Sequence, residues 1–203
     1  MNAPSQSAPS IEFWFEFGST YSYLSVMRIE QLAAEHGVAL RYKPFLLGPI
    51  FKSFGYQNSP FNEQPLKGAY MWRDLERNCE LHGLPWRKPS VFPRLTVLSM
   101  RIALVGAEEP WMGAFCREVM TAAFARDEDI TREEVLRPIL TNLGLNASEV
   151  LEKALSEPNK LRLREQTAEA ERRGIFGAPT FFARGELFWG NDRLEQALAW
   201  AKR

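Results

Sequence analysis

Cysteine is scarce in this chain, and so is histidine, so the residues on which redox and metal chemistry usually depend are few. The 203 residues include two cysteines, Cys79 and Cys116, in separate predicted helices, and two histidines. A disulfide framework or a zinc site needs more such residues at close spacing. The sequence therefore predicts no metal site, two thiols buried like apolar side chains, and a reducing, cytoplasmic location.

An excess of charge and a long apolar run are also missing. Lys plus Arg number 25 and Asp plus Glu number 25, so no basic surface for a nucleic acid is expected. No apolar stretch approaches the ~18 residues that a membrane-spanning helix needs. Residues 1–10 are rich in Ser, Pro and Ala without the apolar core of a secretory signal, which predicts a disordered tail. We expect neither a nucleic acid nor a membrane as partner.

The N-terminal end carries a strand–helix–strand pattern. Within Ile11–Phe17, every second residue is Ile or Phe and the residues between them are Glu, Trp and Glu; this period of two with many aromatics is typical of a strand. Apolar residues at helical spacing predict a helix over Ser22–His36, and Gly37 suits its C-terminal end. A second strand is expected over Ala39–Phe45. The order implies a parallel pair with a right-handed crossover.

The C-terminal end carries a different pattern, two strands and a helix. Pro179 precedes a short strand at Thr180–Phe182, a turn follows, and a second strand is expected over Glu186–Trp189. Asp192 suits the N-cap of a final helix, with Glu195 three residues later. Together the two ends predict a four-stranded mixed sheet in the thioredoxin arrangement.

The region between these ends shows little strand character. We expect a loop-rich segment from Leu47 to Pro65 and then helices. The predicted fold is α/β: a thioredoxin-like domain of residues 11–46 and 174–203, with an inserted all-helical domain of residues 47–173. The predicted helices are Gln64–His82, Pro93–Val105, Pro110–Arg126, Arg132–Leu143, Ala147–Ser156 and Pro158–Arg173.

The first strand–helix junction is the candidate site, because thioredoxin-like enzymes act there. Ser19 and Ser22 occupy the positions at which a redox protein of this fold carries Cys-x-x-Cys. Two serines cannot exchange a disulfide. Ser19 either caps the helix or also donates a hydrogen bond to a ligand thiolate. Lowering a thiol pKa by about 2 units needs about 2.7 kcal/mol, and such a bond supplies about 1.5–3 kcal/mol with about 0.3–1 more from the helix dipole.

Two motifs near the C-terminus extend this site. In Gly177-Ala178-Pro179, the proline is either a plain strand-start residue or the cis-proline that thioredoxin folds place beside the active site; the surrounding pattern favours cis. The peptide before it would then face an extended ligand. In Trp189-Gly190-Asn191-Asp192, the carboxylate either only caps the last helix or also holds a ligand amino group.

These residues resemble the 2-hydroxychromene-2-carboxylate isomerase family and, more distantly, the kappa-class glutathione transferases and DsbA-like proteins. The resemblance rests on FGSTYSYLS, GIFGAPTFF and ELFWGNDRLEQAL and covers the layout from residue 11 to 203. It implies glutathione as cofactor. Ser19 would meet the sulfur, Ala178 before Pro179 would bind the cysteinyl backbone, and Asn191 and Asp192 would hold the γ-glutamyl end. Lys67 is similar to a family lysine that lines the site; on its own it would be a solvated helix residue.

The activity implied by the resemblance is a glutathione-dependent cis–trans isomerisation of a small aromatic carboxylate from aromatic catabolism, by reversible thiolate addition. Two alternatives remain open: a kappa-like transferase that conjugates glutathione to electrophiles, and a binding module without turnover. Relatives also imply a homodimer. Thr20 stands where the family often has proline. The aromatic residues between Phe45 and Trp72 are either core or the wall of a substrate pocket.

Overall fold

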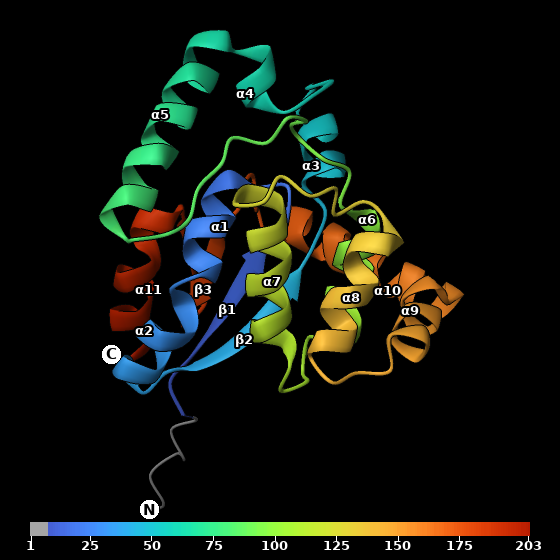
Figure 1. Ribbon diagram of the computed structural model, residues 1–203. Coiled ribbons are helices and arrows are strands. Elements are labelled where there is room, and N and C mark those ends of the chain that lie inside the picture. The colour runs from blue at the N-terminus through green and yellow to red at the C-terminus, as the bar shows by residue number, and fades with distance from the viewer. Residues whose placement is uncertain (1–7) are drawn as a thin grey trace, which may run out of the picture.

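The computed structural model describes residues 8–203, and its centre is a four-stranded sheet (Figure 1). The strands are β1 (Ser10–Phe15), β2 (Ala39–Pro44), β3 (Thr180–Ala183) and β4 (Glu186–Trp189), in the order β2-β1-β3-β4. β1 pairs in parallel with β2 and antiparallel with β3, and β3 pairs antiparallel with β4. The predicted mixed sheet and its thioredoxin-like topology are confirmed.

Helices make up most of the remaining described chain. Those between β2 and β3 agree with the predicted helices from residue 64 onward, with ends that mostly differ by one or two residues. The helices are α1 (Thr20–Val26), α2 (Ile29–His36), α3 (Leu47–Ser53), α4 (Pro60–Glu63), α5 (Pro65–Leu81), α6 (Val97–Val105), α7 (Met112–Phe124), α8 (Glu133–Asn142), α9 (Ala147–Leu155), α10 (Glu157–Arg172) and α11 (Leu194–Ala201).

The first strand and the first helix differ from their predicted extents. β1 begins at Ser10, which the sequence placed in the tail; the rest of that tail, up to residue 7, lies outside the described residues. The strand ends two residues before Phe17, because Glu16 turns inward and its carboxylate accepts the N–H of Gly18. The predicted single helix over 22–36 is two helices. Arg28 donates its N–H to Ser25 three residues back, and this tight turn redirects the chain.

Three further expectations are corrected. The predicted helix over 93–105 begins only at Val97, because Arg94 is held in the preceding loop by Asp127 and Ala123. The segment from Leu47 to Pro65 contains α3 and α4 rather than loop alone. Asp192 does not cap the last helix: residues 191–193 form a 3-10 turn, and α11 starts after it without a side-chain cap.

The two faces of the sheet are buried by different helices. On one face, Phe13, Phe15 and Phe181 share a large core with α1, α7 and α11. On the other, Trp14 and Phe182 pack with α3 and the end of α10 in a smaller core. The large core is continuous from the strands into α6, α7, α8 and α9, so helices from the predicted insertion bury the same apolar surface as the sheet.

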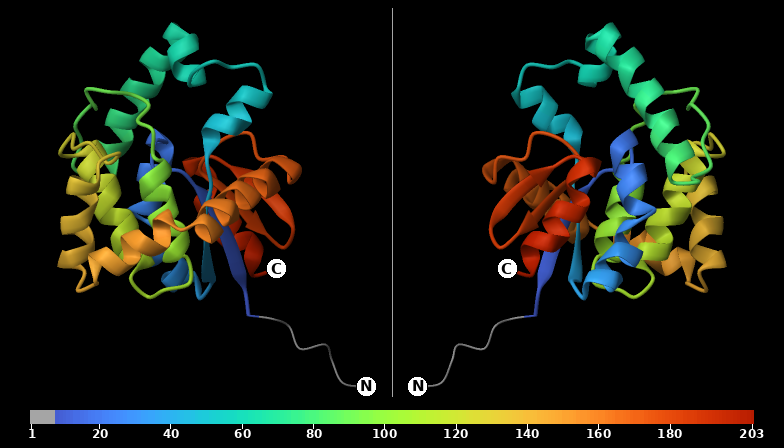
Figure 2. Two further views of the ribbon diagram at one scale, coloured as in Figure 1. Left: turned by 90° about the vertical axis from the view of Figure 1, so that its right-hand side faces the viewer. Right: turned by 90° about the vertical axis from the view of Figure 1, so that its left-hand side faces the viewer.

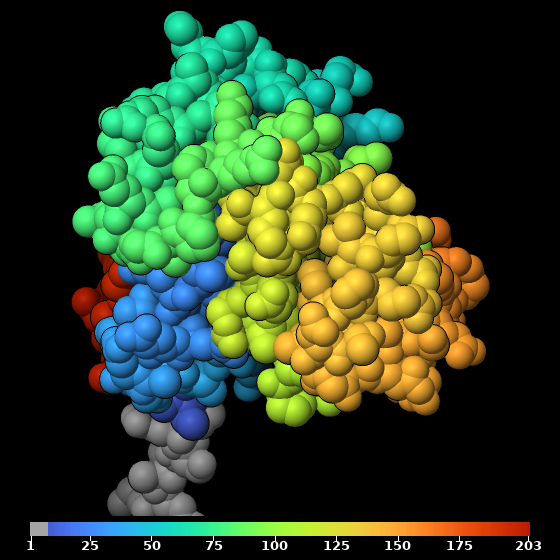
Figure 3. All heavy atoms as spheres, viewed as in Figure 1, coloured from blue at the N-terminus to red at the C-terminus, as the bar shows by residue number. Residues whose placement is uncertain are grey.

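Helices α3, α4 and α5 form an arm that rises above the rest of the molecule. α3 leaves the sheet on the side of α10, and α5 returns on the side of α1 (Figure 2). The connection from α5 to α6 crosses the surface between α5 and α7 (Figure 3). Within residues 8–203, no helix combines the length and the apolar character needed to cross a bilayer.

Candidate functional site

One edge of the sheet brings the sequence-predicted site residues into a common region. β1 and β2 run in parallel and both end at this edge, where β4 also ends and β3 begins: Trp14 pairs with Thr180, and Thr180 pairs with Trp189. The turn to α1, which carries Ser19, and the loop to β3, which carries Ala178, therefore meet here. The α3–α5 arm also leaves from and returns to this end of the sheet.

Ser19 makes two hydrogen bonds that define its place. Its Oγ accepts the N–H of Ser22 at 3.2 Å, so it caps α1, as one interpretation of the sequence required. The same hydroxyl donates to the carbonyl of Ala178 at 2.8 Å. Ser19 is 9% exposed. A hydroxyl rotates to suit its partners, so this donor can turn from the carbonyl to an acceptor placed beside it.

The peptide bond between Ala178 and Pro179 is cis, as predicted. The Ala178 carbonyl faces Ser19, while the Ala178 N–H finds no acceptor in the described part of the chain. Gly190 donates to the Pro179 carbonyl at 3.0 Å, which ties the end of β4 to this loop. A Cβ at Gly177 would lie 2.4 Å from the indole nitrogen of Trp189, so only glycine lets the loop pack this closely. The half-buried Ala178 thus offers a backbone donor to a ligand.

Asn191 and Asp192 follow β4 and point in different directions. Asn191 is buried, and its Oδ1 accepts from Ser25 Oγ at 3.0 Å and from Arg28 at 3.4 Å. It therefore holds the turn against α1. Asp192 is exposed, with its carboxylate 3.4 Å from the guanidinium of Arg193. Of the two, Asp192 has the side chain that is open to a ligand.

Lys67 lies on the exposed first turn of α5, above an aromatic pair that reaches α1. Its Nζ is 5.8 Å from the ring centre of Phe61, which lies 6.3 Å from the ring of Tyr21, two residues after Ser19. The Tyr21 hydroxyl donates to Asp74 at 2.9 Å. Burial and this carboxylate raise the pKa of Tyr21, so the phenol stays protonated. The arm is thereby fixed to the start of α1, with Lys67 on its surface.

Some aromatic residues from Phe45 to Trp72 belong to the core, as one of the two predictions had it, and the pocket-wall role of the others stays a prediction. Phe45 is buried beside Trp14, and Trp72 stacks on Trp86. Phe61 instead faces Tyr21 at the site, and Tyr70 is largely exposed. The segment is therefore partly core and partly surface of the arm.

Glu16 is the residue at this site that the sequence analysis missed. It lies three residues before Ser19 and is 7% exposed. Its Oε2 accepts the N–H of Gly18 at 3.0 Å, its Oε1 accepts the hydroxyl of Thr96, and its carbonyl accepts the N–H of Ser19 at 3.1 Å. Burial raises the pKa of Glu16 to about 8, although the bond from Gly18 opposes the shift. A charged residue in the middle of an aromatic strand pattern was the signal available in the sequence.

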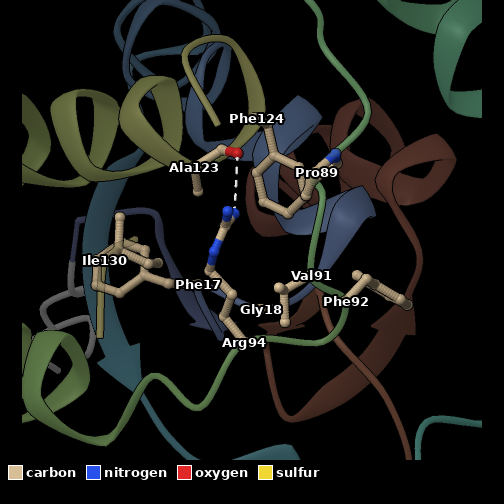
Figure 4. A pocket seen from close by; sticks show the side chains of 9 residues that line it. All are labelled: Phe17, Gly18, Pro89, Val91, Phe92, Arg94, Ala123, Phe124 and Ile130. Atoms are coloured by element: carbon tan, nitrogen blue, oxygen red, sulfur yellow. Dashed lines mark hydrogen bonds between the residues drawn. The ribbon is translucent and has the colours of Figure 1, made fainter. Parts of the chain in front are cut away.

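The small pocket next to this turn is too small for a substrate. It holds about 10 Å³, close to the space of one water molecule. Figure 4 shows Arg94 extending through it toward the carbonyl of Ala123. The pocket is lined by Phe17, Gly18, Pro89, Val91, Phe92, Arg94, Ala123, Phe124 and Ile130. A wider hollow of about 220 Å³ lies elsewhere, between the α6–α7 connection and α9, and does not include Ser19.

The chain's own thiols are buried and held in the protonated form. Cys79 and Cys116 are both buried and unpaired, as predicted. Burial raises the pKa of Cys79 to about 11 and that of Cys116 well above its usual value. Neither is a nucleophile near neutral pH, because only the thiolate reacts. Among residues 8–203, no three His, Cys, Asp or Glu side chains gather as a metal site would require.

Known proteins resemble this chain over nearly its whole length. Residues 10–199 match the family described as DSBA-like thioredoxin domain. The 2-hydroxychromene-2-carboxylate isomerase of Pseudomonas putida is 29% identical, over 91% of this chain and 90% of that protein. Glutathione S-transferase kappa 1 of Rattus norvegicus is 30% identical, over 91% of this chain and 87% of that protein.

A solved structure agrees with these sequence similarities. The structure of a 2-hydroxychromene-2-carboxylate isomerase superposes with a TM-score of 0.84 at 27% identity, and the match covers 94% of this chain and 93% of that one. The similarity therefore extends through the helices of the predicted insertion as well as the sheet.

Proposed function

This chain belongs to the family of DSBA-like thioredoxin domains, and we propose that it is a glutathione-dependent cis–trans isomerase of the 2-hydroxychromene-2-carboxylate isomerase type. The observation that carries the proposal is the contact between Ser19 and Ala178, at the place where redox proteins of this fold have a cysteine pair. Relatives of this chain are named as isomerases and glutathione transferases, which supports the proposal that the chain is an enzyme.

The residues at the sheet edge suit glutathione. The unpaired N–H of Ala178 would bind the backbone of its cysteinyl residue, as an added strand does. The exposed carboxylate of Asp192 would hold the γ-glutamyl ammonium. Lys67, which lies on the arm, would pair with a carboxylate of glutathione. Asn191 would contribute by keeping the turn in place, since its side-chain oxygen already accepts from Ser25.

Ser19 would stabilise the thiolate form of the ligand. Turning its hydroxyl from the Ala178 carbonyl to sulfur would replace a neutral hydrogen bond with a charge-assisted one, worth about 1.5–3 kcal/mol. That range corresponds to roughly one to two units of thiol pKa. The dipole of α1 adds little, because this helix has only seven residues. Ser19 therefore supplies most of the stabilisation.

Glutathione, when bound, would supply a thiolate that adds reversibly to a conjugated carbon, so that a double bond becomes free to rotate before the thiol leaves. The protein's part is to hold the sulfur at Ser19 and to keep the ligand extended along Ala178. Lys67 would also attract the carboxylate of a small aromatic substrate beneath the arm. No electron transfer to the protein is needed, in keeping with serine at positions 19 and 22.

A second candidate is a kappa-like transferase, which the 30% identity to the rat enzyme favours. The two differ in whether glutathione is consumed. Incubating the protein with a conjugated cis-configured aromatic carboxylate and measuring free thiol decides between them: isomerisation leaves the thiol concentration constant, and conjugation lowers it in step with product.

The experiment that tests the shared premise is a titration of glutathione into the wild type and into Ser19→Ala. Binding heat and ultraviolet thiolate absorbance are followed together, with S-methylglutathione as a ligand whose sulfur cannot ionise. We expect saturable binding and thiolate near neutral pH in the wild type, and loss of the thiolate signal in the variant. Absence of binding at millimolar glutathione contradicts both enzyme functions and leaves a thioredoxin-fold binding module.

Assembly and location follow from the same proposal. We propose a homodimer, as the relatives imply, which light scattering of the purified protein tests directly. We propose a cytoplasmic location, because the two cysteines are unpaired and glutathione is kept reduced there. Fractionation of cells that express the natural protein tests this point.

A further inference from the structure

The buried carboxyl group of Glu16 packs directly against the turn that presents Ser19. A Cβ placed on Gly18 would lie 2.8 Å from Glu16 Oε2 and 3.3 Å from the carbonyl of Arg94. Glu16 accepts two hydrogen bonds from this turn, from the Gly18 N–H at its Oε2 and from the Ser19 N–H at its carbonyl, while its Oε1 pairs with the hydroxyl of Thr96. The position of the turn is therefore fixed by Glu16 on one side and by the Thr96 segment on the other.

No cation compensates this carboxyl group within the described part of the chain. The backbone carbonyl of Arg94 lies beside Gly18, but its guanidinium bonds to the Asp127 carboxylate at 2.5 Å and to the carbonyls of Asp127 and Ala123. Arg94 also helps to lower the pKa of Asp129, so its charge is shared by two other carboxylates. An ionised Glu16 would thus be a buried, unpaired charge, which is strongly unfavourable.

We infer that Glu16 is a positioning residue that works in its protonated form: it holds the Ser19 turn without placing a negative charge beside the ligand thiolate, and its ionisation weakens the site. This inference rests on the proposed function. A second anion close to the sulfur would disfavour the thiolate, because like charges raise each other's pKa. The carboxyl group's own preference for the neutral state, with a pKa of about 8, keeps it protonated at neutral pH.

Two variants distinguish this role from plain packing. Thr96 pairs with the carboxyl group in both of its forms: its hydroxyl donates to the ionised carboxylate and can rotate to accept the proton of the neutral carboxyl group. The bond to the charged form is the stronger of the two and so favours ionisation. Removing it with Thr96→Val is expected to move the titration of Glu16 to higher pH. Glu16→Gln keeps the shape and the acceptor for the Gly18 N–H but cannot ionise. A purely structural Glu16 would change stability in both variants and would leave pH profiles alone.

The first measurement uses the ligand-free protein. Infrared difference spectra of 13C-glutamate-labelled wild type and Glu16→Gln, recorded from pH 5 to 10, isolate the carboxyl band of Glu16. We expect a protonated carboxyl band at pH 7 that disappears with a midpoint near pH 8, and at higher pH in Thr96→Val. A carboxylate already ionised at pH 7 overturns the inference.

The second measurement follows thiolate absorbance and kcat/KM against pH with glutathione bound. In the wild type, kcat/KM is expected to fall roughly tenfold for each pH unit above the midpoint, as for a group required in its protonated form. Glu16→Gln is expected to lose this alkaline fall, because its amide has no proton to lose in this pH range. If Glu16→Gln does not fold, the shifted profile of Thr96→Val carries the test.

The outcomes separate the two proposals. Failure of the wild type to bind glutathione overturns the proposed function and, with it, the role of Glu16 at the thiol. Normal binding and turnover with the same alkaline fall in the wild type, Glu16→Gln and Thr96→Val overturns the inference alone.

Discussion

The Ser19 hydroxyl donates to the Ala178 carbonyl at 2.8 Å, although 159 residues separate the two in sequence. The bond joins the start of α1 to the loop before β3, so the two halves of the proposed glutathione site are in contact before any ligand binds. A ligand sulfur that takes the Ser19 hydrogen bond must displace this carbonyl as acceptor. The site is preorganised in position, and one hydroxyl rotation makes it available.

Replacing Ser19 with alanine is expected to abolish thiolate stabilisation while glutathione still binds. Loss of a charge-assisted bond should raise the pKa of the bound thiol by roughly one to two units and lower kcat/KM roughly ten- to hundredfold. Losing the N-cap should also cost about 1 kcal/mol of stability. A pH titration of the thiolate absorbance measures the first effect and thermal unfolding the second.

Ser156→Ala is the matched control, because Ser156 caps α10 in the same way, accepting from the N–H of Asn159 at 3.4 Å. It should reproduce the stability change without the thiol effect. A thiol pKa that stays the same in Ser19→Ala contradicts the proposed role of Ser19.

Replacing Lys67 with methionine tests the basic side of the site. The expected result is roughly tenfold weaker glutathione binding, the equivalent of about 1.4 kcal/mol, and a smaller dependence of binding on salt. Lys88→Met is the control: its Nζ lies 5.2 Å above the ring of Trp72, as that of Lys67 lies 5.8 Å above Phe61. Calorimetry that finds equal losses in both variants would assign Lys67 to its aromatic contact rather than to the ligand.

The sequence specified those parts of the fold that depend on local patterns. Alternation along residues 11–15 distributes side chains between the two buried faces of the sheet, and helical spacing in α11 reflects burial on one face of that helix. The cis-proline at Pro179 was predicted because it precedes a strand in a recognisable order of elements. The position of Ser19 follows for the same reason, since the first strand–helix junction is fixed by the topology, and its role stays a prediction.

What the sequence did not specify depends on contacts between distant segments. The break between α1 and α2 coincides with Arg28, whose side chain reaches Asn191 and Glu195 more than 160 residues later. The start of α6 depends on Arg94 and its bond to Asp127. Contacts between distant residues produce no periodic pattern of residue types in the sequence. A helical spacing such as that over residues 22–36 therefore predicts one continuous helix even where such contacts break it.

The environment of Glu16 predicts how stability depends on pH. Its pKa is about 8 in the folded protein and near 4.5 in the unfolded chain. Between these values the folded state holds the proton and the unfolded state has lost it, so the contribution of Glu16 to stability is full below pH 4.5 and is lost as pH rises through 8. Each unit of difference corresponds to about 1.4 kcal/mol. Denaturant unfolding at several pH values should show this slope in the wild type and a flatter one in Glu16→Gln; parallel curves would mean that Glu16 ionises equally in both states.

The turn before Asp192 allows a test of how that carboxylate is positioned. Gly190 has φ 109° and ψ 151°, a conformation close to glycine-only, and a Cβ there would lie 2.6 Å from Asp192 Oδ1. Gly185, at φ 84° in the turn between β3 and β4, meets nothing within 4 Å. Alanine at either position should lower the melting temperature through backbone strain. Only Gly190→Ala should also weaken glutathione binding.

Combining Gly190→Ala with Asp192→Asn decides whether the affinity loss passes through the carboxylate. If Gly190→Ala acts by displacing Asp192, the double variant should bind glutathione no more weakly than Asp192→Asn alone, because both changes remove one interaction. Additive losses would mean instead that the turn's backbone contacts the ligand and that Asp192 is a separate contributor. Gly185→Ala combined with Asp192→Asn serves as the reference pair, in which the melting temperature falls further and the affinity stays at the Asp192→Asn value.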